Sequence, residues 1–398
     1  MTGASNFLNN ELIVNRWTLS PTTISHKGEL LITCKGTIGT MAFNVIGDIH
    51  IARQIMSISS NYINLNYLKL YLEVYVSELE KVARSIIPGI SRNDILKAVF
   101  PVPPLNEQAK IVEFINCISP SISLFGKKQY ELMKLNENIK PTLKKSILQE
   151  AIQGRLVAQC ETDEPASHLL EKIKSEKQKL VKDGKLKKSA LEESVIFKGD
   201  DNKYYEKLNG EVIDITDQIP FDLPLSWQWV RLEQICSYIQ RGKSPKYSPI
   251  KKYPVVAQKC NQWSGFSIEK ALFIDPDSVD GYQEERILCD GDLLWNSTGL
   301  GTLGRMAIYW ETLNPYGWAV ADSHVTVIRP LSLIYSEYLY YYFVSPTVQS
   351  VIEEKSDGST KQKELSTTTV KSYFVPIPPR EEQLRIIQTI KTLFQSLN

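Results

Sequence analysis

The chain contains two related glycine-rich stretches, GDLLWNSTGLGTLG at residues 291–304 and GELLITCKGTIG at residues 28–39. Each is followed by a second matched motif, PIPPREEQ from Pro376 and PVPPLNEQ from Pro101. Both copies keep one order: Gly-acid-Leu-Leu, a β-rich stretch, an aromatic-rich helix, Pro-x-Pro-Pro and a further helix. The offset between the two copies is far longer than the ~20–50-residue period of solenoid repeats. The sequence therefore predicts two copies of one domain-plus-helix unit.

Duplicated units in one chain usually pack with approximate two-fold symmetry, and the half-sites of a DNA duplex are also related by a dyad. The two copies differ in what precedes the glycine-rich stretch. The second opens near LPLSWQWVRLEQI at residues 223–235, whereas the first has 27 residues before Gly28. We expect that the first domain starts late, because its opening either lies upstream or has been lost.

The composition is that of an ordinary globular protein. A length of 398 residues suggests two or three domains, and 42% hydrophobic with 23% charged residues is enough to form buried cores. The net charge is only +1. A strongly basic surface that binds any polyanion is therefore excluded, and nucleic-acid binding would need local patches and shaped loops.

Cysteine and histidine usage argues against a metal cluster or a disulfide framework. The chain has six cysteines, none of them in a CxxC motif, and four histidines, which fits a reducing compartment. The first residues show no signal peptide, and no apolar stretch approaches the ~18 residues of a membrane span. We therefore expect a cytoplasmic protein without a membrane segment.

Apolar spacing predicts a helix over Leu65–Arg84 and a much longer one from Asn106 to about Gln153. Pro120 and Pro141 lie inside the long helix, where we expect kinks or breaks. At ~1.5 Å per residue an unbroken helix would span ~72 Å, about two turns of a DNA duplex.

The pattern predicts an α+β protein in which two β-rich domains are separated and joined by long antiparallel helices. A lysine-rich run at residues 172–188 suits either a solvated helix face or contact with phosphate or a partner. The expected divisions are 1–104 for the first β-rich domain, 105–190 for a helical spacer, 191–222 for an acidic linker, 223–379 for the second β-rich domain, and 380–398 for a short second helical region.

Two motifs that suggest nucleotide binding fail on context. Gly299–Gly304 matches G-x-G-x-x-G, but a strand pattern follows instead of the helix that a dinucleotide needs. A glycine-rich β-hairpin is the better interpretation. Gly242-Lys243-Ser244 lacks the first glycine of a phosphate-binding loop. This basic segment is either a plain surface loop or a DNA contact, in which Lys243 and Lys246 meet phosphate and Arg241 reads guanine.

Residues 259–263, KCNQW, pair amides with an aromatic ring. Asn261 and Gln262 could bond adenine, although Trp263 is equally suited to a core. Asn314-Pro315-Tyr316 only partly matches the motif of amino-methyltransferases, and no glycine-rich cofactor segment accompanies it. No pattern indicates a catalytic triad or nuclease site, and His324 is the one histidine of interest.

These features together resemble the specificity subunit of a type I restriction–modification system. The resemblance rests on PPLNEQ at 103–108, KSILQEAIQGRL at 145–156, DEPASHLLEKI at 163–173 and PPREEQ at 378–383. The segments KGTIG at 35–39 and GSTKQ at 358–362 are similar to loops of that family's target recognition domains. Nearly the whole chain is covered. It departs from the family in the short opening of the first domain and in Pro120.

The resemblance implies a non-catalytic reader of double-stranded DNA. Each recognition domain would read one half of a split target, and the helices would set the gap between them. They would also dock two methyltransferase subunits, which use S-adenosylmethionine, and endonuclease subunits would join for restriction. No cofactor is expected in this chain.

We expect DNA contacts from thirteen residues in both domains. Those in the second domain are Arg241, Lys243, Lys246, Asn261, Gln262, Ser297, Thr298, Arg305 and Lys361. Those in the first are Asn6, Lys35, Thr37 and Arg92. Two rival interpretations stay open at this point, a helical scaffold for protein assembly that does not read DNA and a lone DNA methyltransferase.

Overall fold

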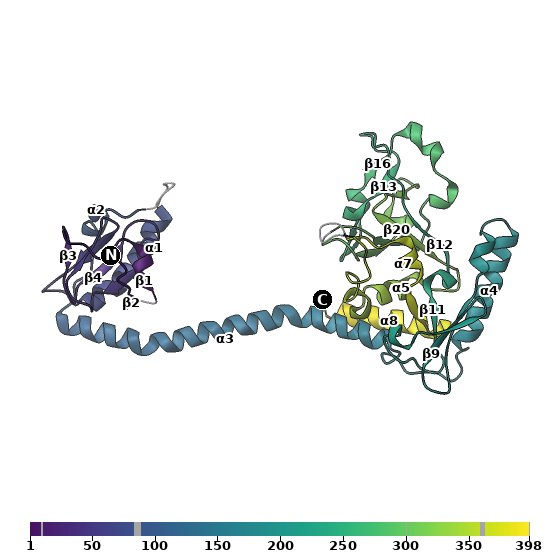
Figure 1. Cartoon of the computed structure of the whole chain (residues 1–398), viewed down its shortest axis with the longest axis horizontal. Helices are drawn as coiled ribbons and strands as arrows, with labels where there is room; N and C mark the ends of the chain where they lie inside the picture. The colour runs from purple at the N-terminus through teal and green to yellow at the C-terminus, as the bar shows by residue number, and fades with distance from the viewer. Residues whose placement is uncertain (9–10, 83–88, 300, 359–362, 398) are drawn as a thin grey trace. The chain divides into compact units, whose positions relative to one another are not determined.

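The structure is a computed structural model that describes residues 1–8, 11–82, 89–299, 301–358 and 363–397 (Figure 1). It divides into two compact units, Met1–Lys134 and Leu135–Asn398. Each unit combines short β-strands with helices, which confirms the predicted α+β class. None of the helices in the described ranges has the length and apolar character of a membrane span.

The first unit is built around a three-stranded antiparallel sheet in the order β5-β4-β7. The central strand β4 (Leu30–Thr33) is buried along its whole length. Alternate residues of a strand face opposite sides, and accordingly Leu30 and Ile32 pack towards α1 (Leu65–Val82) while Leu31 packs on the other side of the sheet. The other elements are η1 (Ala4–Asn6), β1 (Phe7–Leu8), β2 (Glu11–Leu12), β3 (Ile24–Ser25), β5 (Met41–Phe43), β6 (Ile49–His50), β7 (Ile55–Ile58) and α2 (Arg92–Leu96).

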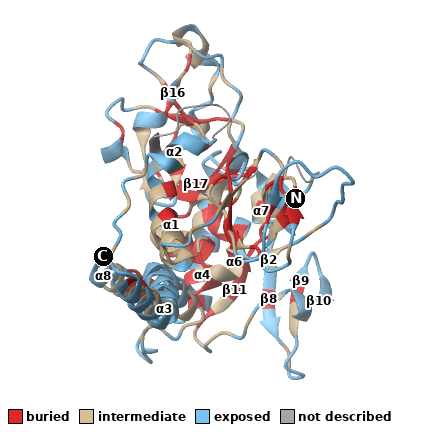
Figure 2. Ribbon diagram, turned by 90° about the vertical axis from the view of Figure 1, so that its left-hand side faces the viewer, coloured by how far each residue is buried: buried red, intermediate tan, exposed pale blue. Residues whose placement is uncertain are grey.

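The second unit repeats this arrangement with β17 (Leu293–Asn296) at its centre. The sheet order is β12-β20-β17-β18. Leu293 and Trp295 pack on one side of the sheet and Leu294 on the other, so the Leu-Leu pair of each copy supplies one residue to each face. Figure 2 shows the buried residues gathered around β17, whereas most of α3 (Leu105–Ile152) is exposed.

Further strands and helices complete the second unit. They are α4 (Ala166–Lys182), β11 (Gln228–Arg231), β12 (Cys236–Arg241), β13 (Pro254–Val256), β14 (Asn261–Gln262), β15 (Gly265–Phe266), β16 (Leu272–Phe273), β18 (Met306–Ile308), β19 (Val320–Ala321), β20 (Val325–Pro330), α5 (Ser336–Phe343), α6 (Pro346–Gln349), α7 (Thr367–Lys371), β21 (Phe374–Ile377) and α8 (Arg380–Ser396).

The duplication extends to individual hydrogen bonds. In each unit two tyrosines of the aromatic-rich helix donate their hydroxyls to main-chain carbonyls just before the Pro-Pro motif. The bonds join Tyr67 to Pro101 (3.3 Å), Tyr71 to Val99 (2.6 Å), Tyr338 to Pro376 (2.7 Å) and Tyr342 to Phe374 (2.6 Å). Equivalent residues thus make equivalent contacts, which confirms the predicted repeat.

A buried glutamine joins two helices in each unit. Gln108 accepts a bond from the backbone N–H of Asn64 (2.8 Å) and donates to the carbonyl of Pro103 (2.8 Å). Gln383 accepts from the N–H of Tyr335 (3.2 Å) and donates to the carbonyl of Pro378 (3.1 Å). The final glutamine of the Pro-Pro motif therefore ties the start of α1 to α3, and the start of α5 to α8.

Helix α3 runs without interruption through Pro120 and Pro141, so the expected breaks are absent. Each proline removes one N–H donor from the helix. Beside Pro120, the hydroxyl of Ser119 donates a hydrogen bond to the carbonyl of Ile115, one turn earlier in the helix (2.6 Å). The predicted antiparallel pairing is present in the second unit. At the start of α8, Glu382 accepts a hydrogen bond from Gln159, which lies in the segment after α3 (2.5 Å). Near the end of α8, the centre of the Phe394 ring lies 5.3 Å from the Nζ of Lys144 within α3.

The segment expected to be an acidic linker is folded. Residues 191–222 contain β8 (Ser194–Lys198), β9 (Tyr204–Leu208) and β10 (Glu211–Asp214), which form an antiparallel sheet. A partly buried ion pair between Glu206 and Arg231 holds this sheet to β11. Charge counting missed the segment because most of its acids are exposed, while Ile196 and Ile215 enter a small core and Glu206 is buried against Arg231.

Replacing Gln383 by Ala should destabilise the second unit by about 1–3 kcal/mol, because it leaves a partly buried N–H and a buried carbonyl without a partner. Urea unfolding followed by tryptophan fluorescence measures this, since six of the seven tryptophans lie in that unit. The control is Gln388→Ala on the exposed side of the same helix, which should change the free energy by less than about 0.5 kcal/mol. Equal effects would contradict the role given to Gln383.

Candidate nucleic-acid interface

The loop between β17 and β18 is the glycine-rich hairpin that the sequence predicts. The two strands pair antiparallel, and Gly299, Gly301 and Gly304 all have positive φ, a conformation that side chains disfavour. A Cβ at Gly304 would also clash with Ile352. The glycines therefore set the path of the loop and fix it against the helical side of the unit.

Polar side chains from several loops meet at this hairpin. The Thr298 hydroxyl lies 2.8 Å from Nδ1 of His324 and accepts a bond from Gln258 (3.0 Å). Arg305 donates to the amide oxygen of Gln262 (2.9 Å), which links the β17–β18 hairpin to the β14–β15 hairpin. We call Gln258, Gln262, Thr298, Arg305 and His324 the tip network.

Arg241 joins the tip network from the end of β12. Its guanidinium forms an ion pair with Glu364, and the backbone of Glu364 bridges to Thr298. The Nε and Nη2 atoms of Arg241 are buried and have no partner among the described atoms. A guanidinium holds its donors in a fixed fork that suits a bidentate acceptor such as guanine or phosphate, but in this structure these two donors of Arg241 are covered.

Two predicted lysines follow Arg241 in the loop after β12. Lys243 is exposed, with its Nζ 5.4 Å from the centre of the Tyr282 ring. Lys246 is exposed as well, but its ammonium lies 2.5 Å from Asp275, which offsets its charge. Lys243 is therefore the better candidate for a phosphate contact.

Three predicted contacts are not on the surface. Asn261 is buried and donates to Asn296 (2.9 Å), while Ser297 is buried and bonds Thr326. Asn6 is also buried, and its amide donates to the carbonyl of Ile13 (2.8 Å). We therefore correct the expectation for these three residues, which shape loops from within. Short polar side chains next to strands serve either role, and sequence alone does not separate the two.

Two further expectations concern the same surface. Trp263 is 53% exposed beside Gln262, so it is not a core residue. Lys361 lies outside the described residues. Sequence reasoning missed Gln258 and Glu364, which stand in no recognisable motif and become visible only through their contacts with Thr298 and Arg241.

The first unit places its predicted residues at the equivalent position. Lys35 and Thr37 are exposed in the loop between β4 and β5, and Arg92 is exposed at the first position of α2. The backbone of Lys35 bridges to Gly89, as that of Thr298 bridges to Glu364. Lys35, Thr37 and Arg92 therefore gather at the same end of the sheet as the tip network does in the second unit.

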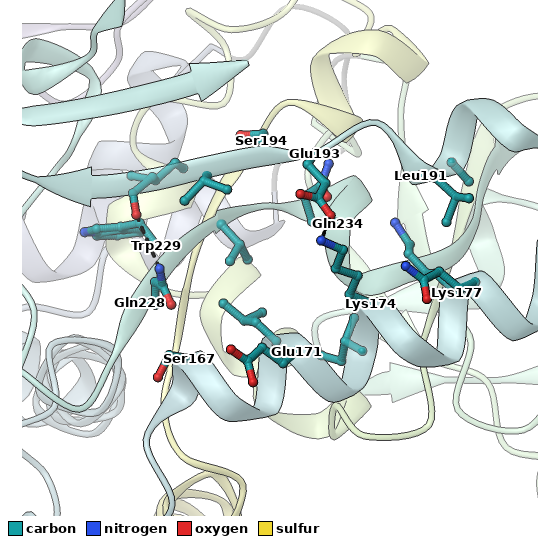
Figure 3. A pocket seen from close by; sticks show the side chains of 17 residues that line it. Ser167, Glu171, Lys174, Lys177, Leu191, Glu193, Ser194, Gln228, Trp229 and Gln234 are labelled. Atoms are coloured by element: carbon teal, nitrogen blue, oxygen red, sulfur yellow. Dashed lines mark hydrogen bonds and ion pairs between the residues drawn. The ribbon is translucent and has the colours of Figure 1, made fainter. Parts of the chain in front are cut away.

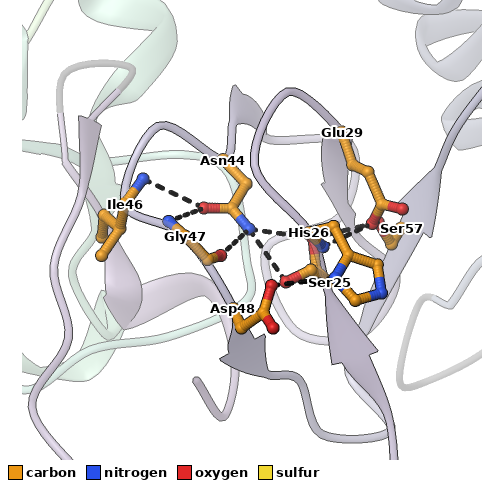
Figure 4. Close-up of polar contacts among 8 residues, drawn as sticks. All are labelled: Ser25, His26, Glu29, Asn44, Ile46, Gly47, Asp48 and Ser57. Carbon is orange, nitrogen blue, oxygen red and sulfur yellow. Dashed lines mark hydrogen bonds and ion pairs between the residues drawn. The ribbon is translucent and has the colours of Figure 1, made fainter.

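A polar cluster supports the strand ends of the first unit (Figure 4). The buried Asn44 amide donates to the Ser25 hydroxyl (3.1 Å) and to the carbonyl of Gly47 (2.7 Å). At its exposed edge, Nδ1 of His26 lies 2.9 Å from a carboxylate oxygen of Asp48. The hydrogen bond with Asp48 raises the pKa of His26.

A pocket of about 330 Å³ lies in the second unit between α4, β8 and β11 (Figure 3). The lysine-rich run forms one of its walls, and not all of that run is solvated. Lys177 is buried and donates to the carbonyl of Glu233 (2.7 Å), and burial lowers the pKa of its ammonium. Lys174 forms an ion pair with Glu193 across the pocket. The part of the chain that the structure describes contains no cluster of His, Cys, Asp or Glu that could hold a metal ion.

The fold and the two loop clusters define a protein of two related binding modules joined by helices. The family model of the type I restriction modification DNA specificity domain matches residues 1–133 and 224–398, one segment in each copy. The chain therefore belongs to the type I restriction–modification specificity family.

Individual relatives agree with this assignment. The chain is 30% identical over 250 residues to the EcoAI specificity subunit of Escherichia coli, and 28% identical over 255 residues to the EcoEI specificity subunit of the same organism. These matches cover 62% and 63% of this chain, but only 38% of either relative's length.

Solved structures share the fold. The HsdS subunit from Thermoanaerobacter tengcongensis matches with a TM-score of 0.53 and 15% identity, over 99% of this chain and 82% of that one. A chain from a structural study of complex assembly in the type I R-M system matches with a TM-score of 0.52 and 15% identity, over 95% of this chain and 78% of that one.

The His26–Asp48 pair gives a prediction for titration by NMR, in which only four histidines contribute signals. His26 should titrate above the ordinary value of about 6.5, because the carboxylate favours the protonated ring. Asp48→Asn should lower the pKa of His26. An unchanged pKa in the variant would show that the two side chains do not interact in solution.

Proposed function

We propose that this chain is the DNA sequence-specificity subunit of a type I restriction–modification complex and reads a two-part target in double-stranded DNA. One observation carries the proposal: each unit is matched by the specificity-domain model, and each has a polar loop cluster at the corresponding end of its central sheet, exposed in the first unit and half-buried in the second. Two equivalent readers in one chain suit a target with two halves.

The tip network has the chemistry needed to read bases. Sequence is read by hydrogen bonds to base edges, whereas phosphate contacts only position the protein. Arg305 and Gln262 offer the guanidinium and amide groups that pair with guanine and adenine, and their mutual bond holds both in place. Arg241 adds a second guanidinium, and Lys243 supplies a phosphate contact.

The low net charge of the chain limits how tightly it can bind DNA without partner subunits. Neutralisation of phosphates supplies much of the affinity of DNA-binding proteins, and a chain of net charge +1 supplies little of it. We infer that tight binding needs two methyltransferase subunits docked on the helices, with S-adenosylmethionine in those subunits. Endonuclease subunits join for restriction. This chain then provides no catalytic group and works in the cytoplasm.

The partner requirement can be measured by a DNA-shift assay. The chain alone should bind a duplex that contains the target only weakly, and addition of the methyltransferase subunit should raise the affinity at least tenfold. A duplex with scrambled target halves is the control. Equal affinity with and without the methyltransferase would contradict the requirement, and absence of any sequence preference would contradict the proposed function.

Arg241→Ala should alter the methylated motif at one position, at a cost of ~1–3 kcal/mol if Arg241 reads a guanine. Methylome sequencing of cells that carry each variant gives the motif directly. Glu364→Gln is the matched control, because it removes the ion pair and keeps the guanidinium, so the motif should persist. Lys243→Gln should weaken binding to all sequences alike. An unchanged motif in Arg241→Ala would exclude Arg241 as a base reader.

A further inference from the structure

The pocket of about 330 Å³ in the second unit lies apart from the residues proposed to contact DNA, and its lining comes from residues 167–234 alone. Figure 3 shows Ser167 and Gln228 at one end of it, and Lys177 and Leu191 at the other. At ~1.5 Å per residue, the wall on α4 is ~15 Å long between Ser167 and Lys177. The pocket is therefore elongated, and its volume falls within the range of about 300–1,000 Å³ that is usual for ligand sites.

The middle of the pocket is apolar. Leu170 and Ile173 line it from α4, Val195 from β8 and Val230 from β11. Ile173 and Val230 are buried, whereas Val195 is exposed at the rim. Contact with such walls removes apolar surface of a ligand from water, which is favourable. The pocket therefore suits the hydrocarbon part of a small molecule.

One end of the pocket holds a buried cation. Lys177 is 5% exposed, and its ammonium donates to the carbonyl of Glu233 (2.7 Å). An ammonium has three N–H donors, and among the described residues Lys177 makes this one hydrogen bond and no ion pair. Burial lowers the pKa of Lys177, against smaller opposing effects of Cys236 and Glu233. A buried charge is costly unless it is paired, so an anion bound at this end would stabilise the ammonium.

The other charged groups of the lining leave Lys177 as the cation for a ligand. Lys174 forms an ion pair with Glu193, so these two charges offset one another. Glu171 is exposed, and water and salt screen its carboxylate. The charge of the pocket is therefore concentrated at the Lys177 end.

We propose that this pocket binds a small, elongated molecule with an apolar body and one anionic head, such as a medium-chain carboxylate. The head accepts hydrogen bonds from the N–H groups of Lys177 that do not bond Glu233, and bonds of this charge-assisted kind are strong. The body lies along the apolar middle of the pocket. A polynucleotide suits the site less well, because its charged and polar neighbouring groups would meet the apolar walls.

The test uses the full chain with octanoate as the probe. Isothermal titration calorimetry should show saturable binding of one octanoate per chain. Octanol has the same length and no charge, so it should bind at least tenfold more weakly, because hydrogen bonds with charged groups are stronger than those between neutral groups. Absence of saturable octanoate binding, or equally tight binding of octanol, would overturn the proposal. This comparison needs no variant and is therefore independent of any effect on folding.

A pair of variants then assigns the site to Lys177. Lys177→Met removes the charge and keeps a side chain of similar length, so it should weaken octanoate binding at least tenfold without weakening that of octanol. Lys179→Met is the matched control, because it makes the same change at an exposed position of the same helix outside the pocket, and it should leave binding unchanged. Equal effects of the two variants, or tight binding by Lys177→Met, would contradict the assignment. Neither measurement involves DNA, so a negative result leaves the proposed function as it is.

Discussion

A buried glutamine at the end of each Pro-Pro motif is the contact on which the rest of the structure depends. In each unit it accepts a hydrogen bond from the backbone N–H of the residue just before one helix and donates to a proline carbonyl before the next. Helix starts leave N–H groups without partners inside the helix, and a buried polar group without a partner is costly. The glutamine meets both needs in one side chain. It thereby joins the aromatic-rich helix of each unit to the helix that leads out of it.

This joint fixes the loops that we propose to contact DNA. The aromatic-rich helix packs on the Leu-Leu strand of the sheet, and the last glycine of each hairpin leaves no room for a side chain against the helical layer, at Val76 in one unit and near Ile352 in the other. The hairpin tips are therefore held on the same rigid layer that the glutamine secures. Side chains on a rigid support lose little conformational freedom on binding, which is what a reader of base edges requires.

The elements that occur in both copies could be predicted from the sequence, whereas the burial of individual side chains could not. Two copies of the Leu-Leu strand, the glycine hairpin and the long helix follow from spacing and composition, because periodicity and glycine reflect backbone geometry directly. The burial of Asn6, Asn261 and Ser297 does not follow, since a short polar side chain beside a strand bonds inward as readily as outward. Nor does the sheet at residues 194–214, where exposed charges hid two core residues, Ile196 within the sheet and Ile215 just after it.

The central claim is that the two units are equivalent readers, each addressing its own half of a divided target. The most direct measurement is methylome sequencing of cells in which one hairpin loop has been replaced at a time, residues 35–39 in one strain and residues 298–305 in the other, with the methyltransferase subunit present in both. The account predicts that each replacement alters a different half of the methylated motif and leaves the other half intact. Replacements that both alter the same half, or that leave the whole motif unchanged, would contradict it.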